Sequence, residues 1–315
     1  MIYTLTLNPA LDRNLWIDSI KKDDSNRIIK EERYAAGKGI DVSRVLTTLG
    51  VCNTALGFVG GFDGDEMEGR LINEGISCNL TRISGETRIN LVLYDQKEES
   101  QTIFSARGPE IQPFELIRLI RLIQDLQDVE TMIISGSLPP GVHAEVYAKI
   151  MEIVRDKRGK VILDTDGEAL QRGIRVGPEV IKPNIHELGR LLGREVTVGE
   201  DLLAAARETL NMGCQTLLVS MGPRGILLVT RNEEMLAVPP KVEVVNTIGA
   251  GDSAVAGFVC GRARGLSDRD ALIRAVAAGT ATTLRPGPAL CTRDDFEALI
   301  PRVEVRQGKH MFAGD

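Results

Sequence analysis

From residue 131 onward the chain repeats one pattern, a short apolar run that ends in polar residues and is followed by a segment with helical periodicity. Four such runs lie at 131–136, 160–165, 180–184 and 216–221. Short, nearly continuous apolar runs separated by helix-length segments are typical of parallel strands that are buried on both faces. The pattern therefore predicts an α/β protein with a mostly parallel central sheet and helices on both sides of it, a three-layer α-β-α arrangement.

Polar residues end these four runs, and we expect them to gather along one edge of the sheet. They are Ser135, Asp164, Lys182, Asn184 and Ser220. Ligands bind outside the carboxyl ends of the strands in such sheets. Polar residues also end strands simply because loops are solvated, but four runs that end in this way favour a ligand site.

The first hundred residues show a different pattern, in which apolar and polar residues alternate as they do in half-exposed antiparallel strands. The alternating segments are 11–20, 26–34, 87–94 and 100–106. Helical patterns at 40–49 and 66–74, and an apolar run at 54–59 that returns to the main sheet, lie between them. We expect a small antiparallel β lid, built from about residues 11–35 and 87–106, within a single domain that spans residues 1–315.

Composition and charge exclude several classes of protein. The 315 residues are 43% hydrophobic and 26% charged, which is ordinary for a soluble globular chain and excludes a disordered, collagen-like or disulfide-scaffold protein. The 38 Lys and Arg residues against 44 Asp and Glu residues give a net charge of -6, so no global basic field exists to hold nucleic acid or a membrane. The N-terminus does not resemble a signal peptide and no apolar stretch is long enough for a membrane span, so we expect a cytoplasmic protein.

A glycine-rich turn that enters a helix carries the strongest chemical signal. Gly249 and Gly251 precede a helical pattern at 254–261, and the unpaired N–H groups at the start of a helix form a binding site for an anion. Asp252 lies inside this positive helix end, where we expect its carboxylate to stay ionised. It is either a base that takes a proton from an attacking hydroxyl or only the cap of the helix. The chain contains no P-loop, no dinucleotide-binding fingerprint and no protein-kinase motif.

Two further features could hold phosphate. Lys38 lies between two glycines at the start of a helical pattern and either approaches a bound anion or is a solvated lysine in a turn. Arg88 and Asn90 alternate with apolar residues, so they share one face of a strand. Arg88 could grip a phosphate with two parallel hydrogen bonds, or be a solvated or ion-paired residue.

Seven motifs in order give the chain a resemblance to a known family. They are Asn8-Pro-Ala-Leu-Asp12, the stretch from Gly37 to Arg44, the stretch from Ser135 to Gly141, the stretch from Leu163 to Leu170, Lys182-Pro-Asn184 with Glu187, the stretch from Ser220 to Gly225, and Gly249-Ala-Gly-Asp252. This set resembles that of the PfkB carbohydrate kinases, which have a ribokinase-like fold. The branch most similar to the chain phosphorylates sugar phosphates and includes 1-phosphofructokinase, tagatose-6-phosphate kinase and the minor 6-phosphofructokinase.

The resemblance implies a role for each matching residue. Asp252 would be the catalytic base, and the amides of Gly249, Ala250 and Gly251 would hold the phosphoryl group in transfer. The sugar phosphate would be surrounded by Asp12, Gly37, Lys38, Gly39, Asp41, Arg88, Asn90 and Ser137, with further charge from Arg107. The nucleotide, ATP, would be lined by Lys182, Asn184, Ser220, Gly222, Gly225, Thr247, Val276, Gly279 and Thr280. Asn184 and Glu187 would position Mg²⁺ through water, and a monovalent cation could bind near the nucleotide loop.

The resemblance also implies a reaction and an assembly. Lys38 and the pair Asn26-Arg27 resemble 1-phosphofructokinase and tagatose-6-phosphate kinase more than the minor 6-phosphofructokinase, and the stretch from Thr247 to Asp252 favours the fructose side. The expected reaction is therefore fructose 1-phosphate to fructose 1,6-bisphosphate, with tagatose 6-phosphate and fructose 6-phosphate as the alternative substrates. The alternatives of another class are a non-catalytic sugar-phosphate sensor and a kinase of a nucleoside or an unphosphorylated sugar. Two positions depart from the family, because Asp41 replaces the usual Asn and Asp166 replaces the usual Ser. We expect a homodimer formed through the lid, with Arg27 directed towards the partner's sugar site.

Overall fold

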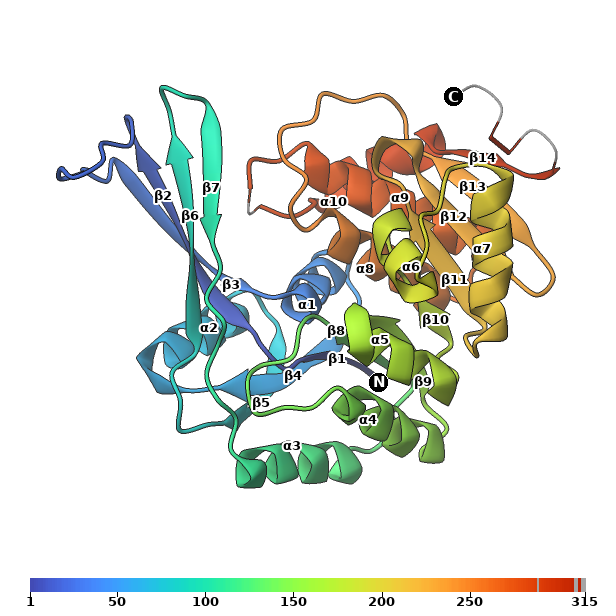
Figure 1. Ribbon diagram of the computed structural model, residues 1–315, viewed down its shortest axis with the longest axis horizontal. Coiled ribbons are helices and arrows are strands. Elements are labelled where there is room, and N and C mark those ends of the chain that lie inside the picture. Colours follow the sequence, from blue (N-terminus) through green and yellow to red (C-terminus); the bar gives the residue numbers. More distant parts are fainter. Residues whose placement is uncertain (288, 309–310, 313–315) are drawn as a thin grey trace.

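The four apolar runs form neighbouring parallel strands in the computed structural model, which describes residues 1–287, 289–308 and 311–312 (Figure 1). These strands are β8 (Thr131–Ser135), β9 (Lys160–Asp164), β10 (Val180–Ile181) and β11 (Thr216–Ser220). β10 is shorter than the apolar run predicts, because Pro183 has no N–H group to donate to a neighbouring strand. The predicted parallel sheet is confirmed.

Ten strands in all form this sheet, in the order β14-β13-β12-β11-β10-β9-β8-β1-β4-β5. On one side, β1 (Ile2–Thr6), β4 (Asn53–Val59) and β5 (Ser77–Arg82) continue the parallel part. On the other side, β12 (Ile226–Thr230), β13 (Glu234–Val238) and β14 (Glu304–Arg306) add an antiparallel edge. The edge strands β5, β12, β13 and β14 extend the sheet beyond what the sequence pattern predicted.

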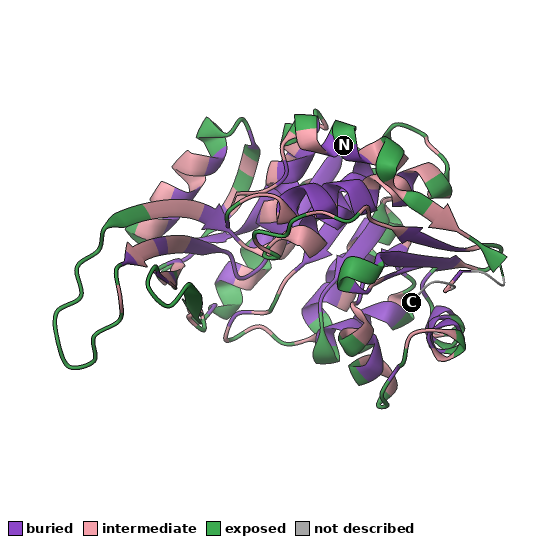
Figure 2. Cartoon of the chain, turned by 90° about the horizontal axis from the view of Figure 1, so that it is seen from above, coloured by how far each residue is buried: buried purple, intermediate pink, exposed green. Residues whose placement is uncertain are grey.

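Helices cover both faces of the sheet, each face with its own apolar core. One face carries α3 (Pro113–Asp125), α4 (Glu145–Asp156), α5 (Gly167–Gly173), α6 (Ile185–Leu192) and α7 (Glu200–Asn211). The other carries α1 (Lys38–Thr48), α8 (Ala250–Ala263), α9 (Asp268–Thr283) and α10 (Arg293–Leu299). Figure 2 shows the buried residues concentrated in these layers. Short 3₁₀ turns lie at Ile174–Val176, Gly222–Arg224 and Ile300–Arg302. None of the helices in the described part of the chain could cross a membrane.

A second sheet of four strands forms the predicted lid and projects from the body (Figure 1). Its strands, in spatial order, are β3 (Lys30–Ala36), β2 (Ala10–Ile17), β6 (Arg88–Asp95) and β7 (Ser100–Phe104). The outer pairs are antiparallel as expected, whereas the central pair of β2 and β6 is parallel, because the chain visits the main sheet between them. The helix α2 (Gly61–Asn73) packs under one face of the lid through Met67 and Leu71. The opposite face, which carries Asp12 and Asn90, looks towards the carboxyl ends of the main strands.

Candidate functional site

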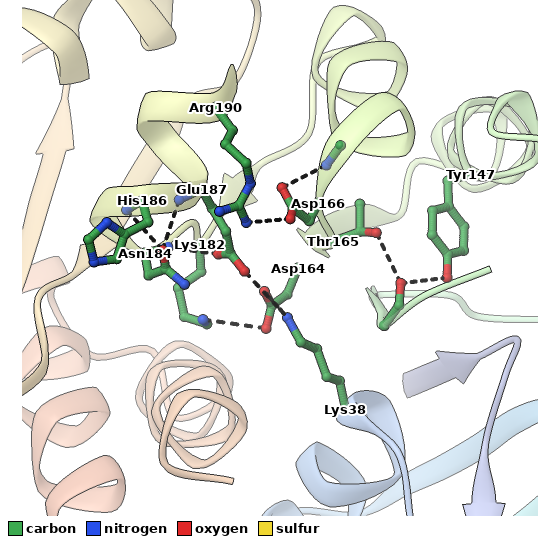
Figure 3. Close-up of polar contacts among 12 residues, drawn as sticks. Lys38, Tyr147, Asp164, Thr165, Asp166, Lys182, Asn184, His186, Glu187 and Arg190 are labelled. Atoms are coloured by element: carbon green, nitrogen blue, oxygen red, sulfur yellow. Dashed lines mark hydrogen bonds and ion pairs between the residues drawn. The ribbon is translucent and has the colours of Figure 1, made fainter. Parts of the chain in front are cut away.

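The polar residues that end the strands gather at one rim, with Asp164 at its centre (Figure 3). Lys38 Nζ lies 3.5 Å from Asp164 Oδ1, and Lys182 Nζ lies 3.4 Å from Asp164 Oδ2. Asp164 and Lys182 are almost fully buried, whereas the Lys38 side chain is 39% exposed. Lys38 Nζ also lies 4.0 Å from Glu187 Oε1. The predicted gathering at this rim is confirmed, and it sets two ammonium groups beside two carboxylates.

Two glycines hold Lys38 against the end of β1. Gly37 is the N-cap of α1 and has a φ of 128°, which favours glycine. A Cβ atom at Gly39 would lie 2.4 Å from Thr6 Oγ1 and 3.0 Å from the Leu5 carbonyl oxygen, so only glycine lets the helix start approach the strand this closely. The alternative of a solvated lysine in a turn is wrong, because Lys38 crosses to Asp164 (Figure 3).

The glycine-rich turn at the start of α8 lies beside Lys182. Gly249 is the N-cap, with a φ of 75°, and Ala250 is the first helical residue. A Cβ atom at Gly251 would lie 3.4 Å from Lys182 Nζ, so this ammonium group lies next to the backbone of the turn. A helix N-terminus and a buried ammonium group together form a strong anion site.

Asp252 does not cap α8, because the N-cap position belongs to Gly249 and no side-chain capping hydrogen bond is made there. Burial is the largest influence on the Asp252 carboxyl and raises its pKa well above the ordinary value, and the nearby carboxylates of Asp41 and Asp164 raise it further. Lys38 and Lys182 oppose this rise. The positive helix end was expected to favour the ionised carboxylate, whereas burial and two like charges shift the pKa of Asp252 in the opposite direction. A raised pKa makes an ionised Asp252 a better proton acceptor.

Two more acidic residues face the same space from the lid side. Asp12 on β2 accepts a hydrogen bond of 2.8 Å from Asn90 Nδ2, and burial raises the pKa of its carboxyl. Asp41 in the first turn of α1 lies 3.5 Å from Arg44, which also pairs with Glu74 at 2.7 Å. Burial, reinforced by Asp12, raises the pKa of Asp41 to about 7. Asp41 is only 15% exposed, so it is not a solvated aspartate of the first helical turn.

Replacing Asp41 with Asn should change how stability depends on pH. The folded-state pKa of Asp41 lies above the ordinary 3.8, so folding favours its protonated form. The stability gained in this way is complete below pH 3.8 and is lost as the pH rises through about 7. Asp41→Asn, which cannot ionise, should therefore raise Tm at pH 8.5 by roughly 2–4 °C and raise it clearly less at pH 5, which lies nearer the lower end of this range. An equal shift at both pH values, measured by thermal unfolding, would show that Asp41 does not titrate there.

Arg88 is tied to the backbone around the lid. Its guanidinium donates to the carbonyl oxygens of Asn8 and Ala106, both at 2.8 Å, and to that of Pro9 at 3.4 Å. The structure thus uses three of its five N–H donors to join β6 to the loop after β1 and the segment after β7. The sequence pattern did not predict this role.

The other residues expected at the sugar side are exposed. Ser137 follows β8 and lines an open hollow of about 640 Å³ together with Lys38 and Glu187. Arg27 is exposed in the loop between β2 and β3, and Arg107 is exposed after β7. Within residues 1–287, 289–308 and 311–312, neither arginine side chain forms a hydrogen bond or an ion pair. The structure does not bring these two arginines into the rim.

Asp166, the second departure from the family pattern, has a structural role in the fold. It is the N-cap of α5, where its side chain accepts a hydrogen bond from the Gly167 amide, and it forms an ion pair with Arg190. Arg190 lowers the pKa of its carboxyl. Asp166 also borders the hollow that contains Ser137.

A cavity of about 760 Å³ lies beside the glycine-rich turn, between α8, α9 and the antiparallel edge of the sheet. It is lined by most of the residues expected around the nucleotide, namely Ser220, Gly222, Gly225, Thr247, Val276, Gly279 and Thr280. Residues 239–242 and Val244 also line this cavity, and the sequence pattern did not predict them there. The only signal was the pair Pro239-Pro240, which marks the end of a strand. The Thr280 hydroxyl donates its hydrogen to the Val276 carbonyl oxygen within α9, so its oxygen can act towards a ligand only as an acceptor.

Asn184 and Glu187 form a capping box at the start of α6. Asn184 Oδ1 accepts from the amides of His186 and Glu187, and Glu187 Oε2 accepts from the Asn184 amide at 2.8 Å. The spacing of Asn184 and Glu187 is therefore explained by the capping box, and the metal role implied by the resemblance is a separate expectation.

Two carboxylate oxygens near this helix start could serve that role. Glu187 Oε1 remains directed towards Lys38, and the buried Asp164 Oδ2 accepts no hydrogen bond. Carboxylate oxygens of this kind suit Mg²⁺, which keeps most of its water ligands. In the part of the chain that the structure describes, no cluster of three or more His, Cys, Asp and Glu residues could hold a metal alone.

Comparison with known proteins agrees with this geometry. Residues 6–295 match the profile of the pfkB family carbohydrate kinases. The chain is 35% identical to 1-phosphofructokinase of Bacillus subtilis over 305 residues, which covers 97% of this chain and 99% of that protein. It is 35% identical to D-tagatose-1-phosphate kinase of Bacillus licheniformis over 288 residues, 91% of this chain and 94% of that one. Among solved structures, phosphofructokinase-2 of Escherichia coli in complex with potassium superimposes with a TM-score of 0.92 and 33% identity, covering 96% and 98% of the two chains.

Proposed function

The chain belongs to the pfkB family of carbohydrate kinases, and from this premise we propose that it transfers the γ-phosphoryl group of ATP to a hydroxyl of fructose 1-phosphate, giving fructose 1,6-bisphosphate. The observation that carries the proposal is the position of Asp252. It lies at the N-terminal end of α8, beside the cavity proposed for ATP, and close enough to Asp41 for their charges to interact. A base between a nucleotide cavity and an acidic, hydroxyl-binding lid face suits a sugar kinase.

In the proposed reaction, Asp252 accepts the proton of the attacking hydroxyl. The hydroxyl oxygen forms a bond to the γ-phosphorus, and the bond from that phosphorus to the oxygen of ADP breaks. The amides of Gly249, Ala250 and Gly251, with Lys182 beside them, stabilise the charge on the transferring phosphoryl oxygens. Lys38, which reaches the rim from α1, supplies a second cation from the sugar side.

The residues at the rim fit Mg²⁺ held largely through water. Glu187 Oε1 and Asp164 Oδ2, which accepts no hydrogen bond but lies 3.4 Å from Lys182 Nζ, are the oxygens that could hold it, with Asn184 fixing Glu187 through the capping box. When bound, Mg²⁺ would supply positive charge that neutralises the phosphate groups of ATP. Since the similar phosphofructokinase-2 was solved with potassium, we also propose a monovalent cation near the nucleotide loop.

On the sugar side, we propose that hydroxyl groups are read by Asp12, Asp41 and Asn90 and that the backbone of Gly37 and Gly39 closes around the sugar. The two remaining N–H donors of Arg88, with Lys38 and Ser137, would hold the phosphate of the substrate. Because one similar protein is a D-tagatose-1-phosphate kinase, tagatose 1-phosphate is the second candidate. Tagatose 6-phosphate and fructose 6-phosphate remain alternatives with the phosphate at the other end. A non-catalytic sensor is disfavoured because the base and the anion-binding turn are both present.

The test is to incubate the purified protein with ATP, Mg²⁺ and fructose 1-phosphate and to follow the products by ³¹P NMR. We expect the signals of fructose 1,6-bisphosphate and ADP to grow in equal amounts. ADP formation without the bisphosphate would show ATP hydrolysis instead, and no change in either signal would contradict the proposed reaction.

We further propose that the lid and the three-layer body act as one unit and that two chains pair through their lids. Apolar side chains of Ile28, Ile29, Ile103 and Phe104 are each more than half exposed on the lid, and β7 is a free edge strand. Pairing of two lids would cover them and bring Arg27 towards the other chain. Light scattering at micromolar concentration should give twice the 34.3 kDa mass of one chain. A mass of 34.3 kDa in active enzyme would contradict the dimer.

A further inference from the structure

A hydrogen bond joins the lid to the chain just after α9. Tyr94 Oη on β6 donates to the carbonyl oxygen of Gly287, 193 residues further along the chain, at 3.2 Å. Tyr94 belongs to the same strand and the same lid face as Asn90, which binds Asp12. Burial raises the pKa of Tyr94, so its phenol stays protonated and able to donate at neutral pH. The sugar side of the lid is thus joined to the segment after α9.

That segment also contacts the glycine-rich turn at two points. A Cβ atom at Gly287 would lie 2.3 Å from Asn246 Nδ2, so the Asn246 amide packs directly on the Gly287 backbone. Asn246 Oδ1 accepts a hydrogen bond from the Ile248 amide at 3.2 Å, which shapes the approach to Gly249. A Cβ atom at Gly249 itself would lie 2.6 Å from Leu290 Cδ2. Gly287 and Leu290 therefore pack against the turn that would hold the phosphoryl group.

We propose that Tyr94 is a positioning residue that couples closure of the lid to the geometry of the phosphoryl-binding turn. The contacts run from Tyr94 to Gly287, then to Asn246, and from there to Ile248 and Gly249. When the lid closes over a sugar, Tyr94 holds this segment against the turn, and a nucleotide that moves the turn displaces the lid in return. The inference rests on the proposed function, since it takes the neighbouring cavity to hold a nucleotide.

The chain provides its own reporter of this coupling. Trp16 is the single tryptophan of the sequence. It lies opposite Tyr94 in the register of β2 and β6, and the two rings stack with centroids 4.7 Å apart and an angle of 8° between their planes. Fluorescence of Trp16 therefore reports on the surroundings of Tyr94 rather than on the nucleotide cavity, whose lining residues lie in other elements.

A matched pair of variants tests the proposal. Tyr94→Phe keeps the ring and its stack on Trp16 but removes the donor to Gly287. Tyr34→Phe removes another hydroxyl from the same lid face, one that donates to Glu32 within the lid. Each protein is titrated with Mg²⁺ and a non-hydrolysable ATP analogue, binding is measured by calorimetry, and the change in Trp16 emission is recorded.

We expect the nucleotide analogue to change Trp16 emission in the wild type. Tyr94→Phe should bind the analogue within about twofold of the wild-type Kd, lose at least half of the emission change and lower kcat about three- to tenfold, the range for one neutral hydrogen bond. Tyr34→Phe should keep the wild-type emission change and the wild-type kcat. Gly287→Ala, which displaces Asn246 from the other side, should reproduce the losses of Tyr94→Phe, and the double variant should lose no more than either single one.

The measurements distinguish failure of the proposed function from failure of the coupling. Absence of binding heat in the wild type would contradict the proposed nucleotide-dependent function. Binding heat without a Trp16 response in the wild type would overturn the coupling alone. The coupling would also be overturned by a Tyr94→Phe protein with wild-type kcat and wild-type emission change, or by equal losses in Tyr34→Phe.

Discussion

Asp252→Asn is expected to lower kcat by roughly 10² or more, the scale of general-base catalysis by a positioned side chain. Asn has nearly the shape of Asp but cannot accept the proton of the attacking hydroxyl. Because Gly249 rather than Asp252 caps α8, the fold should survive the change. Binding of ATP should stay near the wild-type value, since the amides of the turn and Lys182 are unchanged. The measurements are steady-state kcat, nucleotide affinity by calorimetry and thermal unfolding.

Asp294→Asn provides the control for this prediction. Asp294 is an exposed acidic residue in the first turn of α10, so its substitution removes the same charge from another helix start. We expect its kcat to match the wild type. An Asp252→Asn protein that loses thermal stability but keeps its kcat would show that the carboxylate serves the helix and not the reaction.

Lys38→Met is expected to lower kcat by roughly 10², the cost of removing one preorganised charge from a developing anion. The Lys38 ammonium lies 3.5 Å from Asp164 and 4.0 Å from Glu187, and it is one of two cations that act on Asp252. Its loss leaves the transferring phosphoryl group facing carboxylates with one cation fewer. The fold should hold, because Lys182 still neutralises the buried Asp164 at 3.4 Å.

Lys160→Met is the matched control for this change. Lys160 is the first residue of β9 and Asp164 is the last, so Lys160 lies at the opposite end of the same strand. There it pairs with Glu179 at 3.4 Å. Its substitution should leave kcat unchanged. If Lys38→Met lowered Tm but kept the wild-type kcat, Lys38 would be only a structural partner of Asp164.

The sequence pattern was sufficient for the parts of the fold that depend on local periodicity. The four apolar runs, their polar ends and the separate lid all follow from which residues alternate and which do not. The parallel pairing of β2 with β6 does not, because it depends on the chain leaving the lid for the main sheet and returning.

The electrostatics of the site could not be predicted from the sequence in the same way. The raised pKa of Asp252 depends first on its burial and then on carboxylates from α1 and β9, all of which only the fold brings about. Arg88 has the expected position on its strand, but three of its N–H donors bond to carbonyl oxygens of two other segments. The contact of Tyr94 with Gly287 joins residues that no local pattern relates. Motif spacing thus indicates which residues meet, whereas their protonation and partners follow from packing.

The most direct test of the account is a panel of kcat/KM values with ATP and Mg²⁺ as the donor system. The panel contains fructose 1-phosphate, tagatose 1-phosphate, tagatose 6-phosphate, fructose 6-phosphate and unphosphorylated fructose. We expect the highest value for fructose 1-phosphate and a value at least tenfold lower for fructose, because each charge-assisted hydrogen bond to the phosphate contributes about 1.5–3 kcal/mol. An equal or higher value for unphosphorylated fructose, or no turnover of any sugar phosphate, would contradict the assignment of this site to a sugar-phosphate kinase.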